Sequence, residues 1–146
     1  MNRKKLKNIE QLLESLSIEL HGQYTEYSED MVIITVPVND DESKFQSVKG
    51  YVADRKTSQN ETAQMVMLSS TVCTLHDHPE LDFKELLKKN YYMIYSKLTI
   101  TDEDYLEVEA ATRYEYATAQ EVEAMIEEVA RKTEELKQEL LGAKAN

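Results

Sequence analysis

The stretch IYSKLTITDEDYLEVEA, residues 94–110, decides the fold. Apolar and polar residues alternate on both sides of the acidic segment Asp102-Glu103-Asp104. This alternation is typical of two strands that each bury one face. The residues expected to point to the core are Ile94, Leu98, Ile100, Leu106, Val108 and Ala110. For the two faces to coincide, Leu98 must lie opposite Val108, and Asp102-Glu103-Asp104 must form the loop between the strands. The stretch therefore predicts an antiparallel hairpin.

The other face of this hairpin carries a second pattern. The same register places Lys97 opposite Glu109, an attractive pair worth about 0.2–1 kcal/mol. Tyr95 and Tyr105 share this face with Ala111. Tyrosine suits interfaces because it combines apolar area with a hydroxyl group, so this face is a candidate partner surface. Ordinary strand tyrosines at a wet surface are the alternative.

Three further strands are expected before the hairpin. They cover residues 31–36, 48–55 and 63–75. Their apolar and β-branched residues favour strands, and Pro37 ends the first of them. The polar segments 39–44 and 56–61 are expected to be solvated loops. The third strand is long enough to predict a bend or bulge near Ser69-Ser70.

Three helices are expected around these strands. The first runs from about Lys4 to Leu20, with an apolar stripe at three- and four-residue steps, and His21-Gly22 ends it. The last runs from Thr118 to Leu141 and carries a similar stripe. The second and third helices each begin with a capping box, Asp82 with Glu85 and Thr118 with Glu121.

This order of elements predicts an α+β fold. The expected order is α-β-β-β-α-β-β-α, with three helices packed on a five-stranded, mainly antiparallel sheet. A chain of 146 residues has the usual size of one domain, so residues 1–146 are expected to form a single domain.

Composition narrows the class of function. The net charge of -11 would repel a phosphate backbone, so nucleic acid is not an expected partner. No stretch approaches the roughly 20 apolar residues of a membrane span, and the basic start at Arg3–Lys7 is not followed by the apolar core expected of a secretory signal. Cys73 is the single cysteine, which excludes an internal disulfide. We therefore expect a cytoplasmic protein that binds neither nucleic acid nor membrane.

His76-Asp77-His78 is the best candidate for a metal site, because two imidazoles and a carboxylate are suitable ligands for zinc or iron. However, Pro79 breaks the backbone there, and His21 is the one other histidine. A solvated turn is therefore the expected structure, with no metal and no catalytic residue. With three glycines in the whole chain there is no glycine-rich phosphate cradle, and no cofactor is expected.

The order of elements, the small size, the acidic pI and the amphipathic last helix together resemble the type III secretion chaperone-like fold. That grouping includes the Tir chaperone relatives and the YbjN family of bacterial sensory-transduction regulators. The resemblance covers nearly the whole chain and implies a noncatalytic homodimer that holds a nonglobular segment of a client protein.

The resemblance also implies where the homodimer would pair. The region is the second helix with the strand that follows it. With Tyr105 from the tyrosine pattern, the expected dimer or partner residues are Phe83, Leu86, Leu87, Tyr91, Tyr95 and Tyr105. A short helix with a strong apolar face needs a surface to pack on, which agrees with this assignment.

The leading hypothesis is thus a noncatalytic protein-binding module, chaperone-like or regulatory, that acts as a homodimer on an extended segment of a client protein. Two alternatives stay open at this point. One is a small metal-dependent enzyme that uses the turn His76-Asp77-His78, and the other is a structural assembly subunit with one fixed partner.

Overall fold

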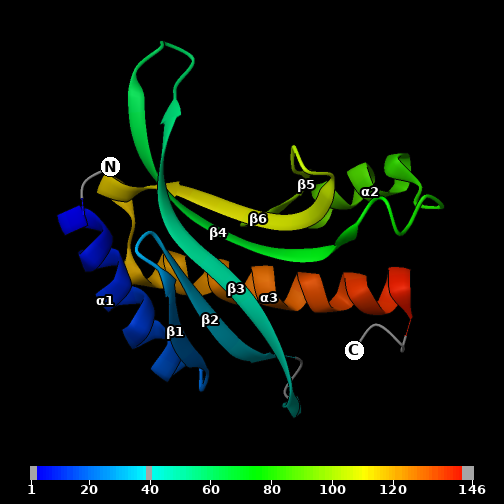
Figure 1. Cartoon of the computed structure of the whole chain (residues 1–146), viewed down its shortest axis with the longest axis horizontal. Coiled ribbons are helices and arrows are strands. Elements are labelled where there is room, and N and C mark those ends of the chain that lie inside the picture. The colour runs from blue at the N-terminus through cyan, green and yellow to red at the C-terminus, as the bar shows by residue number, and fades with distance from the viewer. Residues whose placement is uncertain (1–2, 39–40, 143–146) are drawn as a thin grey trace.

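The computed structural model describes residues 3–38 and 41–142 (Figure 1). It has an α+β fold with a six-stranded antiparallel sheet in the order β1-β2-β3-β4-β6-β5. The elements in chain order are α1 (Arg3–Glu19), β1 (Gln23–Ser28), β2 (Met31–Val38), β3 (Asp41–Lys56), β4 (Thr62–Thr74), α2 (Phe83–Lys89), η1 (Asn90–Tyr92), β5 (Lys97–Ile100), β6 (Tyr105–Arg113), η2 (Tyr114–Tyr116) and α3 (Ala119–Leu141).

The prediction of five strands is wrong, because the sheet has a sixth strand, β1, at its edge. Its sequence, QYTEYS, is polar, and only Tyr24 is partly covered. An edge strand packs little of its surface, so it lacks the apolar alternation that marks the inner strands. The chain enters β1 through Gly22, where a Cβ atom would clash with the carbonyl oxygen of Thr35. The left-handed residue that ends α1 is His21, at φ 60°, rather than the glycine.

The prediction of a loop at residues 39–44 is also partly wrong. Residues 39–40 lie outside the described residues, and β3 already begins at Asp41. The long β3 pairs with β2 and then with β4, and its hairpin with β4 projects beyond the rest of the sheet (Figure 1). The start of β3 pairs with β2, and this pairing outweighs the low strand propensity of its polar residues.

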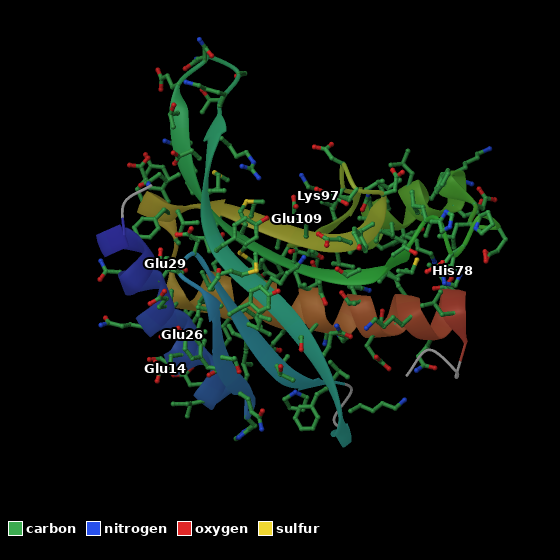
Figure 2. The ribbon with its side chains drawn as sticks, viewed as in Figure 1. Glu14, Glu26, Glu29, His78, Lys97 and Glu109 are labelled. Atoms are coloured by element: carbon green, nitrogen blue, oxygen red, sulfur yellow. The ribbon has the colours of Figure 1, made fainter. Side chains whose placement is uncertain are left out.

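The predicted hairpin register is confirmed. Leu98 pairs with Val108 and Lys97 with Glu109, and Figure 2 shows the latter two side by side. Asp104 adopts φ 64°, as the last residue of a three-residue hairpin loop commonly does. The expected irregularity in β4 lies between Thr71 and Cys73, slightly beyond Ser69-Ser70.

Two of the expected core residues of this hairpin are not in the core. Ile94 is 82% exposed and Ile100 is 49% exposed. The strand begins only at Lys97, so Ile94 lies in a bend before it. Ile100 lies on the same face as Leu98, but at the end of a strand that short α2 covers incompletely. Both side chains are therefore left on the surface.

The core lies between one face of the sheet and the helices α1 and α3. The helix α3 packs on β3, β4 and β6, and α1 packs at the β1–β2 end, while α2 lies near β5 (Figure 1). The stripe residues Val122, Met125, Ile126 and Val129 of α3 are each at most 2% exposed. Burial of each such side chain contributes about 1.5–3 kcal/mol, so α3 is a main support of the sheet.

Both predicted helix caps are confirmed. The Asp82 side chain accepts from the backbone N–H groups of Lys84 and Glu85, and the Thr118 side chain accepts from that of Glu121. The Glu121 carboxylate also contacts the sheet. It accepts a 2.8 Å hydrogen bond from Thr112 Oγ1 and so links α3 to β6.

Candidate functional site

A group of large apolar side chains is exposed on α2, on η1 and around β5. Its members are Phe83 (53% exposed), Leu87 (71%), Tyr91 (86%), Tyr92 (76%), Ile94 (82%), Tyr95 (46%) and Ile100 (49%). We call this group the α2–β5 surface. Phe83, Leu87 and Ile100 line one hollow, Tyr91 and Tyr92 a second, and Ile94 and Tyr95 a third beside α3. Large apolar side chains exposed in one region of a protein are characteristic of interaction sites.

The α2–β5 surface contains a shallow hollow of about 260 Å³. Phe83 and Leu87 of α2 line it from one side and Ile100 of β5 from the other. Leu86, Leu98 and Leu106 also line it and belong to the buried core. A partner side chain placed in this hollow would therefore contact the protein core directly.

The two neighbouring tyrosines extend this surface beyond α2. The rings of Tyr91 and Tyr92 meet edge to face, with centroids 5.1 Å apart. Both side chains line a second hollow with Lys88 and Lys89. Edge-to-face packing orients the rings although both are exposed, and tyrosines oriented in this way are common anchors of protein interfaces.

Glu128 of α3 supports the bend that carries Ile94 and Tyr95. Its carboxylate accepts from the backbone N–H of Ile94 (3.1 Å), from the backbone N–H of Tyr95 (2.7 Å) and from Ser96 Oγ (2.7 Å). Burial alone would raise the pKa of Glu128, but these hydrogen bonds outweigh burial and lower the pKa below its usual range. The side chain is therefore held as a buried, ionised acceptor.

Asn90 closes part of the free edge of the sheet beside this surface. Its Oδ1 accepts a 2.6 Å hydrogen bond from the backbone N–H of Leu98. In an antiparallel pair, alternate residues point their N–H groups away from the neighbouring strand, and on an edge strand these groups are free to pair with another chain. The N–H of Leu98 is already used within the chain.

The structure brings together only some of the residues expected at the interface. Leu86 is 5% exposed and belongs to the core, because the inner side of α2 must pack on the sheet. Tyr95 lies in the bend beside α3, whereas Tyr105 lies on the sheet face opposite Leu106, so these two tyrosines do not share a face as expected. Sequence reasoning did not assign Tyr92, Ile94 or Ile100 to this candidate surface, nor Glu128 to its support.

The turn His76-Asp77-His78 does not assemble a metal site. Thr74 Oγ1 donates to the Asp77 carboxylate at 2.8 Å, and His78 Nδ1 lies 3.3 Å from Glu80 Oε1. His78 lies at the α2 end of the molecule (Figure 2). Within residues 3–38 and 41–142, no group of three His, Cys, Asp or Glu side chains could hold a metal ion.

Other reactive groups are in settings that do not suit catalysis. Burial raises the pKa of the Cys73 thiol, and Glu80 and Asp77 raise it further, so the reactive thiolate is disfavoured. On the sheet face opposite α3, Glu107 accepts from Lys49 Nζ (3.0 Å) and from Thr71 Oγ1 (2.9 Å). This arrangement links three strands and leaves the carboxylate already paired. In the part of the chain that the structure describes, no helix combines the length and apolar character needed to cross a membrane.

Comparison with known proteins gives a likeness of fold. No protein-family model and no curated protein matches the chain, and the relation to the YbjN family stays a prediction. Among solved structures, the chain is similar to one chain of the crystal structure of the ExsC-ExsE complex, with a TM-score of 0.57 and 13% sequence identity. The match covers 92% of this chain and 95% of that chain. The likeness supports the type III secretion chaperone-like fold that the sequence resembles.

Proposed function

We propose that this protein is a noncatalytic, chaperone-like or regulatory binding module that acts in the cytoplasm as a homodimer and holds an extended segment of a client protein. The α2–β5 surface is the observation that carries the proposal. Covering its large apolar side chains with a partner removes them from water and so stabilises the pair. The similar fold of a chain in the ExsC-ExsE complex, a complex of two proteins, supports the same reading.

A second copy of this chain is the proposed partner for the α2–β5 surface. In a twofold-symmetric pair the same patch serves both copies, so one exposed patch can be covered completely. Exposed aromatic rings and aliphatic side chains around a hollow fit the pattern of interface anchors that fill pockets on the partner. Because Asn90 already uses the N–H of Leu98, pairing through side chains is favoured over extension of the sheet at β5.

For the client we propose a hollow of about 840 Å³ between the end of α1, the end of β2, Phe45 of β3 and α3, which adjoins the hollow at Ile94 and Tyr95 through Glu127 and Arg131. Leu20, Pro37 and Phe45 contribute apolar surface to it, and Phe45 is 48% exposed. Clefts of this size that combine apolar walls with a few polar groups are typical binding sites. An extended, partly apolar segment of a client fits this chemistry.

The two alternatives receive less support. The metal-dependent enzyme would need ligands around His76-Asp77-His78 that the described residues do not provide. A structural assembly subunit would use the same α2–β5 surface for one fixed partner. It would form a hetero-oligomer of constant composition instead of a homodimer with an open client site.

The test is to measure the oligomeric state of the purified 146-residue chain by light scattering and to identify proteins retained by the tagged chain in its native host. A homodimer that retains a specific protein supports the proposal. Phe45→Ser should weaken client retention and leave the homodimer intact, because Phe45 lies in the client hollow and outside the α2–β5 surface. A monomeric chain that retains no protein would contradict the proposal.

A further inference from the structure

The bend between η1 and β5 lacks the backbone pairing of a helix or strand, yet it carries two members of the α2–β5 surface. Residues 93–96 form this bend, and Ile94 and Tyr95 project from it. Such a segment would ordinarily leave its N–H groups to water and sample several conformations. Here two consecutive N–H groups and the Ser96 hydroxyl all donate to one side chain, Glu128.

The chemistry of Glu128 suits this task. Its two carboxylate oxygens share the three donors: Oε1 accepts from Ile94, and Oε2 accepts from Tyr95 and Ser96. Hydrogen bonds to an ionised acceptor are shorter and stronger than those between neutral groups. The side chain is part of a residue that is only 6% exposed, so water competes little for these bonds. Through these three hydrogen bonds the Glu128 carboxylate fixes the backbone conformation of residues 94–96.

We propose that Glu128 is the positioning residue of the α2–β5 surface, which holds residues 94–96 so that Ile94 and Tyr95 are presented in a fixed arrangement to a second copy of the chain. The inference rests on the proposed homodimer and adds a determinant that lies on α3. A surface that is ordered before pairing loses less conformational freedom when it pairs, and so it pairs more tightly.

The variant Glu128→Gln tests this role in the full chain. A glutamine keeps the size of the side chain but replaces one acceptor oxygen with a donor NH₂ group, which opposes the donors of the bend. The matched control is Glu135→Gln, since Glu135 is exposed on the same helix, lies outside the hollows at Ile94 and Phe45, and carries the same charge. Two quantities are measured: the dissociation constant of the homodimer by sedimentation, and the hydrogen exchange of the Ile94 and Tyr95 amides.

Glu128→Gln is expected to raise the homodimer dissociation constant by about tenfold or more and to speed exchange at both amides, while Glu135→Gln changes neither. An unchanged dissociation constant for Glu128→Gln, with a dimeric wild-type chain, overturns the inference and leaves the homodimer standing. A wild-type chain that stays monomeric overturns the proposed homodimer, and this inference with it.

A second variant keeps the test decisive if Glu128→Gln does not fold. Ser96→Ala removes one of the two donors to Oε2 and leaves the carboxylate in place. It is expected to raise the dissociation constant several-fold while circular dichroism shows a folded chain. A folded Ser96→Ala variant that pairs as tightly as the wild type overturns the inference.

Discussion

Truncation of Leu87 to alanine tests the proposed pairing at one side chain. Leu87 is 71% exposed on α2, at the edge of the hollow that it shares with Phe83 and Ile100. Alanine favours helix more than any other residue, so the substitution should not disturb α2. Ile18 on α1 gives a matched control because it is 70% exposed, helical and outside the α2–β5 surface.

The magnitude follows from the exposure of Leu87. The truncation removes three carbon groups, which would contribute about 2.4 kcal/mol if the side chain were fully buried. Because 71% of the side chain is exposed in the single chain, about 1.7 kcal/mol remains to be gained when a partner covers it. A twofold-symmetric pair contains the residue twice, so the homodimer should lose about 3 kcal/mol, which is roughly two orders of magnitude in the dissociation constant.

Sedimentation velocity over a range of concentrations measures this change, and urea unfolding at low concentration reports the stability of the single chain. Leu87→Ala should weaken the homodimer strongly while the free energy of unfolding of the single chain shifts by about 0.5 kcal/mol or less. Ile18→Ala should change neither quantity by a comparable amount. If Leu87→Ala pairs within threefold of the wild type, or if Ile18→Ala weakens pairing equally, the assignment of the α2–β5 surface is refuted.

Three further predictions concern groups whose environment the structure defines. The pKa of Glu128 is lower in the folded chain than its ordinary value of 4.5, so the ionised carboxylate stabilises the fold above that value and this stabilisation is lost as the pH falls through the lowered pKa. Urea titrations should therefore show that Glu128→Gln is less stable than the wild type at pH 7 and that the gap narrows below pH 4.5; a constant gap would contradict this. Burial raises the pKa of the Cys73 thiol, so Cys73 should react slowly with iodoacetamide in the folded chain and quickly in urea. Equal rates would show that the thiol is accessible. Gly22→Ala should lower the free energy of unfolding by at least about 1–3 kcal/mol, because its Cβ would meet the Thr35 carbonyl, and an unchanged urea midpoint would show that the α1–β1 turn can move.

The sequence predicts best those features that depend on neighbours along the chain. The register of the β5–β6 hairpin follows from alternation over a few residues, and the caps at Asp82 and Thr118 follow from spacing within one helical turn. In each case a local pattern and the surrounding fold favour the same conformation. These elements, with the stripe of α3, are enough to predict the α+β class.

The features that the sequence does not reveal depend on contacts between distant segments. Glu128 looks like one member of a solvated acidic face, and only the bend at residues 94–96, more than 30 positions earlier, makes it a buried acceptor. Ile94 looks like a core residue until the strand is seen to begin at Lys97. The polar edge strand β1 has no apolar alternation to find. The candidate surface could thus be predicted only in part, at Phe83 and Leu87 of α2 with Tyr91 and Tyr95 after it.

The hydrogen bond between Asn90 and Leu98 has a consequence for colloidal behaviour. An open sheet has two ends, and a chain that could join its first strand to the last strand of the next copy would grow head to tail into a fibre. At one of these ends the backbone N–H of Leu98 already donates to Asn90 Oδ1. A fibre of this kind would therefore lack one backbone hydrogen bond at every junction. An apolar replacement of Asn90 would expose that donor and should make concentrated solutions prone to filament formation. A single amide oxygen on η1 thereby helps to keep assembly of this chain finite.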